Sequence, residues 1–375
     1  MKERSPAPLM NTYLHKRFQP TRCSLVILCL VLWGVIPGVA EDEEGYDPAE
    51  AGQTEWEAVT TDIEQAVGVA EHRRNFSGYF LIRVRDPEQR PISEAEVSGY
   101  FRLWADNPRR RERTRFEGET NRNGIFRTIA ETYGSLDFSI QHPDFYPIAD
   151  SFGFNAPGLR REMVMRPRID PVPMSALRAV RIPFPDGSGP FGFDLVRMDW
   201  MPPHGVGEQK DLLMNISFET FSVRGDQTLA LRADLPIQFT GTDNGIQPAA
   251  SDFRHRMMSQ FRSDYEAPQD GYRRQYRLIM DSSRDTQEGN DPANLWYFRI
   301  RSTPSPEGEP IGIYGKIYGP ILDVTLQGAF LRFDGIYIQP VRGSRNMEFD
   351  LQNNRAQERV APRWRSATHL NVTHP

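Results

Sequence analysis

Apolar and polar residues alternate over many short segments of this chain, and turn residues separate these segments. In the first of them, Phe80, Ile82 and Val84 occupy every second position. Successive side chains of a strand point to opposite faces, so a period of two predicts β-strands. The 29 glycines and 30 prolines exceed average usage, and they stand largely between these segments. The pattern predicts an all-β fold and excludes collagen, a coiled coil, a multispan membrane protein and a wholly disordered chain.

A first folded unit is expected over residues 75–167. Its clearest turn is Asn121–Gly124, because Asn-Gly tolerates the positive φ of a tight hairpin. Turn signals recur roughly every 8–12 residues, which is the spacing of a β-sandwich. The expected strands are Phe80–Val84, Val97–Trp104, Ile125–Ile129, Leu136–Ile140, Phe145–Ala149 and Glu162–Met165.

Three runs of this unit, LIRVRDPEQRPISEAEVSGYF, GETNRNGIFRTI and YGSLDFSIQHPDFYPIAD, carry a family pattern. The pattern resembles the carboxypeptidase regulatory-like, or transthyretin-like, domain over residues 76–166, about a quarter of the chain. An insert at 105–116 departs from the compact form of that family. The resemblance implies an Ig-like sandwich without catalytic residues, so none is carried over. The matching positions are Asp86, Pro91, Ile92, Val97, Asn123, Gly124, Phe126, Gly134, Leu136 and Tyr146.

The zinc carboxypeptidase itself has no counterpart in this sequence. Its metal motif requires His-x-x-Glu with a distant histidine, and none of the seven histidines has a glutamate three residues later. We therefore expect no metal and no cofactor.

A second, larger β domain is expected over residues 168–352, after the Pro-rich stretch Arg168–Pro173. Only Asp252–Tyr265 has apolar residues four apart, which predicts one short helix. Turn signals include Asn244-Gly245 and Asp334-Gly335. The expected strands are Phe193–Val196, Leu212–Phe221, Leu229–Leu235, Tyr276–Met280, Trp296–Arg301, Ile311–Ile317 and Val324–Ile338.

The sequence thus predicts two antiparallel β-sandwich-like domains, the first Ig/transthyretin-like and the second larger, with at most one short helix. The second domain resembles C-terminal regions of uncharacterised exported bacterial proteins in FDLVRMDWMPPHGVGEQKDLLMNI, DNGIQ, APQDGYRRQY and YGKIYGPI. That resemblance implies no activity.

Residues 1–40 have the pattern of an export signal. A basic region with five Lys or Arg and one acid precedes an apolar run, and Gly38 and Ala40 suit a signal peptidase. The alternative is an uncleaved anchor helix, which Pro37-Gly38 would break at the short end of a membrane span. Both cysteines, Cys23 and Cys29, lie in this segment, so the mature chain would have no disulfide and no thiol nucleophile. We expect a periplasmic or extracellular protein that keeps no membrane segment after cleavage.

The segment that follows is strongly acidic. Residues 41–71, called the acidic segment below, hold eleven Asp or Glu and no Lys or Arg. With few apolar residues to bury, residues 41–74 are expected to be a disordered linker. The polar, Arg-rich tail at 353–375 is expected to be disordered as well.

One loop of the second domain gathers residues with functional chemistry. Asp199, His204 and Asp211 could form a metal or acid–base cluster beside Trp200. The alternative is a strand-end loop in which proline and glycine fix the turn and Trp200 packs. The alternation on 296–301 places Trp296, Phe298 and Ile300 in the core. Their neighbours Tyr297, Arg299 and Arg301 are the candidates for a ligand surface.

The segment Asp281–Gln287 begins like a calcium loop. It lacks glycine at the sixth position and has Pro292 where the loop requires a bidentate glutamate, so we expect no calcium site.

The sequence favours an exported, non-enzymatic protein that acts by binding or scaffolding at the cell envelope or outside, with polysaccharide or an envelope protein as partner. The alternative is a glycan-directed hydrolase with two carboxylates in the second domain, which no sequence motif would reveal. A third hypothesis is that the first unit binds a partner through an open edge of one of its sheets. Nucleic acid is not expected, because the chain has a net charge of −5.

Overall fold

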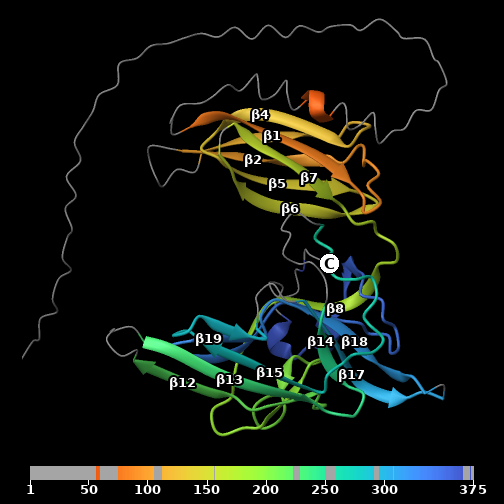
Figure 1. The fold of residues 1–375 in the computed structure, drawn as a ribbon. Coiled ribbons are helices and arrows are strands. Elements are labelled where there is room, and N and C mark those ends of the chain that lie inside the picture. The colour runs from red at the N-terminus through yellow and green to blue at the C-terminus, as the bar shows by residue number, and fades with distance from the viewer. Residues whose placement is uncertain are drawn as a thin grey trace, which may run out of the picture. The chain divides into compact units, whose positions relative to one another are not determined.

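The computed structural model describes residues 56–59, 75–104, 112–155, 157–222, 229–249, 259–290, 295–306, 308–365 and 372. Within these ranges the secondary structure is almost entirely β, which confirms the predicted fold class (Figure 1). The export signal at 1–40 lies outside the described residues. No helix of the described part is long and apolar enough to cross a membrane.

The first unit consists of two sheets of short strands. One sheet has the order β4-β1-β7, and the other has the order β3-β2-β5-β6. Phe80, Ile82 and Val84 of β1 are buried in the core of this unit, as their alternation predicts. The bounds are β1 (Phe76–Arg85), β2 (Glu96–Leu103), β3 (Glu112–Glu119), β4 (Ile125–Thr132), β5 (Ser135–His142), β6 (Phe145–Gly153) and β7 (Gly158–Val164).

The turn at Asn121–Gly124 forms as the sequence predicts. The Asn121 side-chain oxygen accepts hydrogen bonds from the backbone N–H groups of Asn123 and Ile125, at 3.0 and 2.9 Å. Gly124 has φ +73°, and a Cβ there would lie 2.3 Å from the carbonyl oxygen of Val84. Only glycine fits this position without strain.

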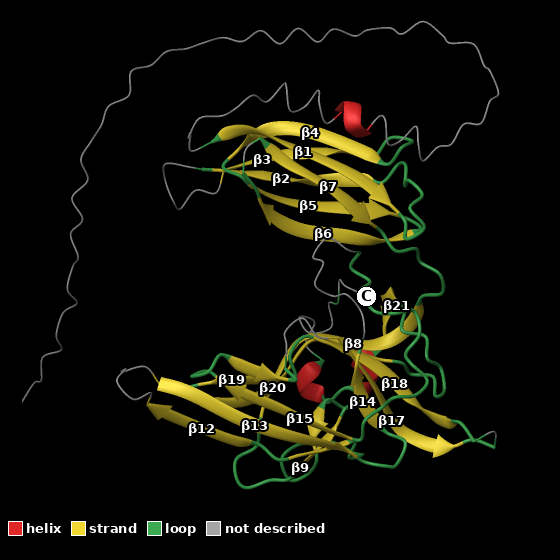
Figure 2. Cartoon of the chain, in the orientation of Figure 1, coloured by secondary structure: helices red, strands yellow, loops and turns green. Residues whose placement is uncertain are grey.

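The second unit is built from two seven-stranded sheets (Figure 2). One runs β10-β9-β11-β13-β15-β16 with β12 paired to β13, and the other runs β14-β17-β18-β20-β8-β21 with β19 paired to β20. The largest core cluster takes side chains from both sheets, among them Phe193, Leu235 and Trp296. A second cluster, which includes Tyr297, Tyr314 and Tyr337, buries the other face of the β17-β18-β20 sheet.

The bounds of these elements follow the chain. They are β8 (Val172–Pro183), β9 (Phe191–Asp194), β10 (Asp199–Trp200), β11 (Leu212–Met214), β12 (Ser217–Ser222), β13 (Leu229–Phe239), β14 (Gly245–Pro248), β15 (Gln275–Asp281), β16 (Thr286–Glu288), β17 (Leu295–Pro304), β18 (Pro310–Tyr318), β19 (Leu322–Thr325), β20 (Gly328–Ile338), β21 (Phe349–Asn354), α2 (Ala356–Arg359) and the 3-10 turn Pro362–Trp364. All described pairings between named strands are antiparallel except β1 with β7 and β8 with β21.

Two predictions about local structure in the second unit are wrong. The expected single strand Val324–Ile338 is a hairpin of β19 and β20, which turns before Gly328, where φ is +135°. Asp334-Gly335 makes no turn and lies inside β20, where Gly335 pairs with Tyr318 and lies against the Tyr337 ring. The described part of the expected helix, residues 259–265, is not helical, and the rest lies outside the described residues.

The tail is ordered as far as residue 365, contrary to expectation. The Trp364 side chain is 7% exposed, and its ring N–H donates to the carbonyl oxygen of Met198 at 2.7 Å. Val360 and Ala361 are buried in the main core of the second unit. Four apolar side chains at 356–364 are therefore enough to fix a segment whose composition is mostly polar.

Part of the predicted disordered linker is also ordered. Residues 56–59 form one helical turn, and Trp56 is 3% exposed because it packs on Tyr79, Leu81 and Ile125. The rest of the linker up to residue 74 lies outside the described residues.

Candidate functional site

Two of the predicted site residues meet in a buried cluster. The Arg301 guanidinium binds the Asp211 carboxylate through Nε and Nη2, both at 2.9 Å, and Asp194 through Nη2 at 2.7 Å. Both carboxylates are buried, and Asp194 was not among the predicted residues. Burial raises the pKa of Asp211, and the neighbouring guanidinium opposes that rise. We call Asp194, Asp211 and Arg301 the buried ion cluster.

The buried ion cluster fixes the loop at 195–210. Asp194 accepts backbone hydrogen bonds from Val196, Arg197, Glu208 and Gln209, at 2.9 to 3.0 Å. Asp211 accepts another from Leu195 at 2.9 Å. The carboxylate oxygens are thus occupied by the protein itself, so this arrangement organises structure and offers no access to a substrate.

The other residues of that loop do not join the cluster. Asp199 accepts from the backbone of Trp200 and binds Arg363 at 2.6 Å. His204 is exposed and packs edge-on against Phe191. Trp200 is buried, and its ring N–H donates to the carbonyl of Pro183 at 3.0 Å. No group of three metal-ligating side chains occurs among the described residues. The loop therefore has the features of the second interpretation, a strand-end loop in which Trp200 packs.

The expected ligand face of Trp296–Arg301 is corrected by the structure. Trp296, Phe298 and Ile300 are core residues as predicted, but Tyr297 and Arg299 are buried as well. The Tyr297 hydroxyl contacts the backbone N–H and the carboxylate of Asp264, and Arg299 donates to two backbone carbonyls, those of Asp243 and Gln269. A second layer covers this face, which the alternation alone could not reveal.

Arg301 also leaves the predicted alternation. The register of β17 shifts between Ile300 and Thr303, and Arg301 has a φ of +55°. A β-bulge changes the direction of the side chains that follow it. The bulge directs Arg301 to the two aspartates instead of to the face of Tyr297.

The segment 281–287, which begins like a calcium loop in the sequence, contains the turn between β15 and β16. Asp281 accepts from the backbone and hydroxyl of Ser283, at 3.0 and 2.6 Å, and binds Arg232 at 3.1 Å. Its oxygens therefore have protein partners.

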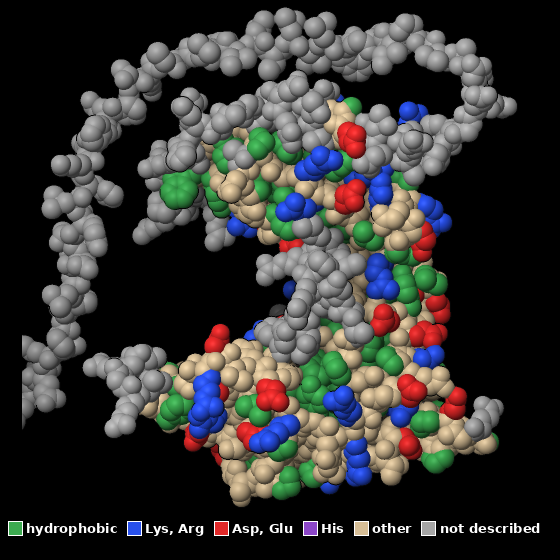
Figure 3. Space-filling model, in the orientation of Figure 1, with side chains coloured by type: hydrophobic (Ala, Val, Ile, Leu, Met, Phe, Trp, Pro, Cys, Tyr) green, Lys and Arg blue, Asp and Glu red, His purple; other side chains and the backbone are tan. Residues whose placement is uncertain are grey.

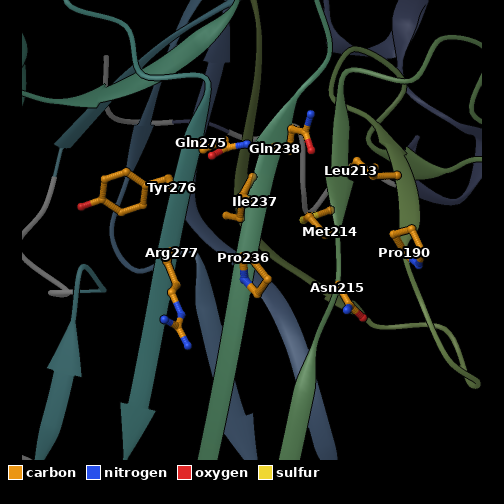
Figure 4. A pocket seen from close by; sticks show the side chains of 10 residues that line it. All are labelled: Pro190, Leu213, Met214, Asn215, Pro236, Ile237, Gln238, Gln275, Tyr276 and Arg277. Carbon is orange, nitrogen blue, oxygen red and sulfur yellow. The ribbon is translucent and has the colours of Figure 1, made fainter.

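One cavity among the described residues lies over β11, β13 and β15 (Figure 4). It is a groove of about 460 Å³ that opens to solvent. Its lining residues are Pro190, Leu213, Met214, Asn215, Pro236, Ile237, Gln238, Gln275, Tyr276 and Arg277.

Strand register explains how distant residues come together in the groove. Leu213 pairs with Gln238 and Gln238 pairs with Gln275, so these three side chains form one row across the sheet. Pro236 and Arg277 pair in the next row. Figure 4 shows the Gln238 and Gln275 amides near one another at one end of the groove, with Arg277 and Pro236 toward the other. We call Asn215, Gln238 and Gln275 the groove amides.

The groove amides keep their hydrogen-bonding capacity. Among the described residues no side-chain hydrogen bond forms to Asn215, Gln238 or Gln275. Arg277 is held by Asp234, with Nε 2.8 Å and Nη2 2.5 Å from its two oxygens. This ion pair lowers the pKa of Asp234. The described lining contains no carboxylate, histidine, serine, threonine or cysteine, and its titratable side chains are those of Tyr276 and Arg277.

Sequence reasoning missed the groove because its polar residues come from β13, from β15 and from the position that follows β11. Gln238 and Gln275 are 37 positions apart and carry no motif. Only the register of β11, β13 and β15 shows that they are neighbours. Sequence patterns can place each residue on a strand, but they cannot set the pairing between strands that are distant in the chain.

Charged side chains on the face of the molecule shown in Figure 3 are mixed in sign. Among the described residues there, basic and acidic side chains alternate over both units and do not gather in one patch.

Comparisons with known proteins give little guidance. No family model matches the chain, and no curated protein matches it. Among solved structures, a streptococcal ancillary pilin aligns with 64% of this chain at 8% identity and a TM-score of 0.19. The alignment spans 59% of the pilin chain. A TM-score this low supports no argument about fold or function.

Proposed function

We propose that this chain is an exported, non-enzymatic binding protein whose groove over β11, β13 and β15 holds a segment of polysaccharide. The observation that carries the proposal is the set of three groove amides, whose side chains have no partner among the described residues and which line an open groove of about 460 Å³. A cavity of this size falls within the range of ligand sites.

The chemistry of the groove suits sugar hydroxyls. An amide side chain both donates and accepts hydrogen bonds, as a hydroxyl does. The apolar walls of Pro190, Leu213 and Pro236 would contact the C–H surface of a sugar ring. The Tyr276 ring packs edge-on against Trp296 at 5.0 Å, so hydrogen bonds rather than aromatic stacking would hold the ligand.

The positions of the carboxylates in the second unit favour binding over hydrolysis. A glycosidase uses two carboxyl groups that flank the scissile bond. Asp194 and Asp211 share one guanidinium in a buried site, and the described lining of the groove has no carboxylate. The groove itself therefore offers no pair of carboxylates for hydrolysis.

Export and the identity of the first unit belong to the same proposal. Residues 1–40 support export, and we expect the mature chain to begin at Glu41. The two-sheet arrangement of residues 75–167 supports a carboxypeptidase regulatory-like module that does not itself carry the ligand site. Cell fractionation with N-terminal sequencing tests export, and a cytoplasmic chain that retains Met1 would contradict it.

A glycan array tests the binding site. The mature chain is compared with the double variant Gln238→Ala/Gln275→Ala and with Gln352→Ala, which removes an exposed glutamine on β21 away from the groove. We expect the wild type and Gln352→Ala to bind the same glycans and the double variant to lose at least tenfold in affinity. Equal binding by all three proteins, or no binding by the wild type, would contradict the proposal.

A further inference from the structure

The outer face of sheet β4-β1-β7 is covered by a piece of the acidic segment. Phe80, Ile82 and Val84 of β1 point into the sandwich core, so Tyr79 and Leu81 lie on the opposite face. On that face Trp56 packs against Tyr79, Leu81 and Ile125, and Val59 packs beside it. Among the described residues, 56–59 thus cover the apolar surface on this face.

Beside Leu81 this face carries positive charge, whereas Glu131 and Glu162 lie farther along it. Register places Leu81 between Arg127 of β4 and Arg160 of β7. The Arg160 guanidinium lies over the Trp56 ring, 4.6 Å from its centre, which is the geometry of a cation–π contact. We call Tyr79, Leu81, Ile125, Arg127 and Arg160 the docking face.

The occupant complements the docking face in two ways. Trp56 supplies a large aromatic side chain for the apolar centre, and Glu55 and Glu57 flank it in the sequence with negative charge. Eleven acids and no basic residue in the acidic segment extend this match. A short segment that anchors one aromatic side chain on a charged surface is a recurrent mode of peptide recognition.

The occupant is attached to the face that it covers. Fifteen residues separate Val59 from Asn75, just before β1. A short tether of this kind gives a segment an effective concentration near the millimolar range, so the segment acts as an intramolecular competitor. A peptide of similar chemistry would have to displace it.

We propose that the docking face binds an acidic, tryptophan-bearing peptide of a partner protein, and that residues 56–59 occupy the face until the partner displaces them. This goes beyond the proposed polysaccharide function and uses a different sheet of the molecule. It also gives the acidic segment a role that a disordered linker would not have.

A peptide-binding experiment tests the inference. The probe is a fluorescent peptide with the sequence of residues 50–62, titrated into the mature wild type and into Trp56→Ala, with fluorescence anisotropy as the readout. We expect Trp56→Ala to bind the peptide at least tenfold more tightly than the wild type, because its docking face is free. A peptide with alanine in place of its tryptophan is the matched control and should not bind either protein.

An additional variant and the salt dependence of binding test whether charge contributes to peptide recognition. Arg160→Ala in the Trp56→Ala background should weaken peptide binding several-fold, and added salt should weaken it too, because charge contributes. A folded Trp56→Ala protein that does not bind the peptide would overturn the inference. If Trp56→Ala does not fold, recovery of its circular dichroism on adding the peptide supports the inference, and no recovery overturns it. Glycan binding is read separately, so failure here leaves the proposed function standing.

Discussion

The groove and the buried ion cluster are two polar sites of the second unit that have opposite properties. In the cluster, Asp194 and Asp211 accept five backbone hydrogen bonds between them and share Arg301. In the groove, no described residue hydrogen-bonds to the side chains of Gln238 and Gln275. The charged side chains, which could take part in catalysis or bind an ion, are therefore in the buried cluster, where no ligand can reach them. The neutral amides are in the open groove.

The difference shows how burial decides the role of a polar residue. A buried charge must be paired, so its hydrogen-bonding capacity is used by the protein. A half-exposed amide can remain bound to water at little cost, and a ligand can replace that water. Changes in the cluster should therefore affect stability, and changes in the groove should affect binding.

The largest expected effect is on stability, from Arg301→Ala. This change leaves Asp194 and Asp211 buried without their cation, and we expect it to lower the free energy of unfolding by about 3–5 kcal/mol. Urea unfolding of the mature chain measures the effect. Arg332→Ala is the matched control, because its pair with Asp334 is exposed, and it should cost less than about 1 kcal/mol.

The pH dependence of Arg301→Ala sharpens this test. Burial raises the pKa of Asp211, and loss of the guanidinium removes the opposing effect. A carboxyl group with a raised pKa in the folded state favours folding at low pH and costs stability as the pH rises. Part of the loss should therefore be recovered at about pH 5 relative to pH 8. Equal losses for Arg301→Ala and Arg332→Ala would contradict the structural role of the cluster.

A smaller loss of stability is expected from Trp364→Ala. The side chain is buried and hydrogen-bonded to Met198, so truncation should cost about 3 kcal/mol. Trp104→Ala is the matched control, since Trp104 is 53% exposed and its truncation should cost less than about 1 kcal/mol. Thermal unfolding measures both variants. No difference between them would mean that the tail is disordered, as its composition suggests.

In the groove we expect the reverse pattern. The single variant Gln238→Ala should change the free energy of unfolding by no more than about 0.5 kcal/mol, because the side chain has no described partner to lose. Its affinity for a glycan selected on the array should fall several-fold by isothermal titration calorimetry. A loss of stability as large as that of Arg301→Ala would show that the amide is structural.

The smallest expected effect concerns the pH dependence of binding. Arg277 lowers the pKa of Asp234, so their ion pair is present above the usual Asp range near pH 4 and is lost as the pH falls through the lowered value. Glycan affinity should be constant from about pH 8 down to the usual Asp range near pH 4 and should weaken only below it, as Arg277 loses its fixed position. Asp234→Asn should bind more weakly at neutral pH and show no further change on acidification. A wild type and variant with the same pH profile would exclude this positioning role.

The sequence predicted the fold better than the site. Alternation correctly placed Phe80, Ile82 and Val84 in one core and Trp296, Phe298 and Ile300 in another. It could not show that Tyr297 and Arg299 are also buried, because the alternation pattern of a strand does not indicate whether a second layer packs on its other face.

The wrong predictions have local physical causes. The polar tail is ordered because Trp364 finds a buried site, and composition averages such a residue away. Trp56 has the same effect in the acidic segment. The bulge at Arg301 reversed a face assignment that depended on an unbroken period of two. In each case a single residue determined the local structure, and the sequence pattern of its neighbours did not predict it.

The most direct test of the groove as a binding site is nuclear magnetic resonance of its side-chain amides. Isotopically labelled mature chain is titrated with an oligosaccharide selected on the array, and the side-chain NH₂ signals of Asn215, Gln238 and Gln275 are followed beside that of Gln352. We expect saturable shifts of the three groove amides and no shift of Gln352. Shifts confined to residues outside the groove, with the three amides unchanged, would contradict it.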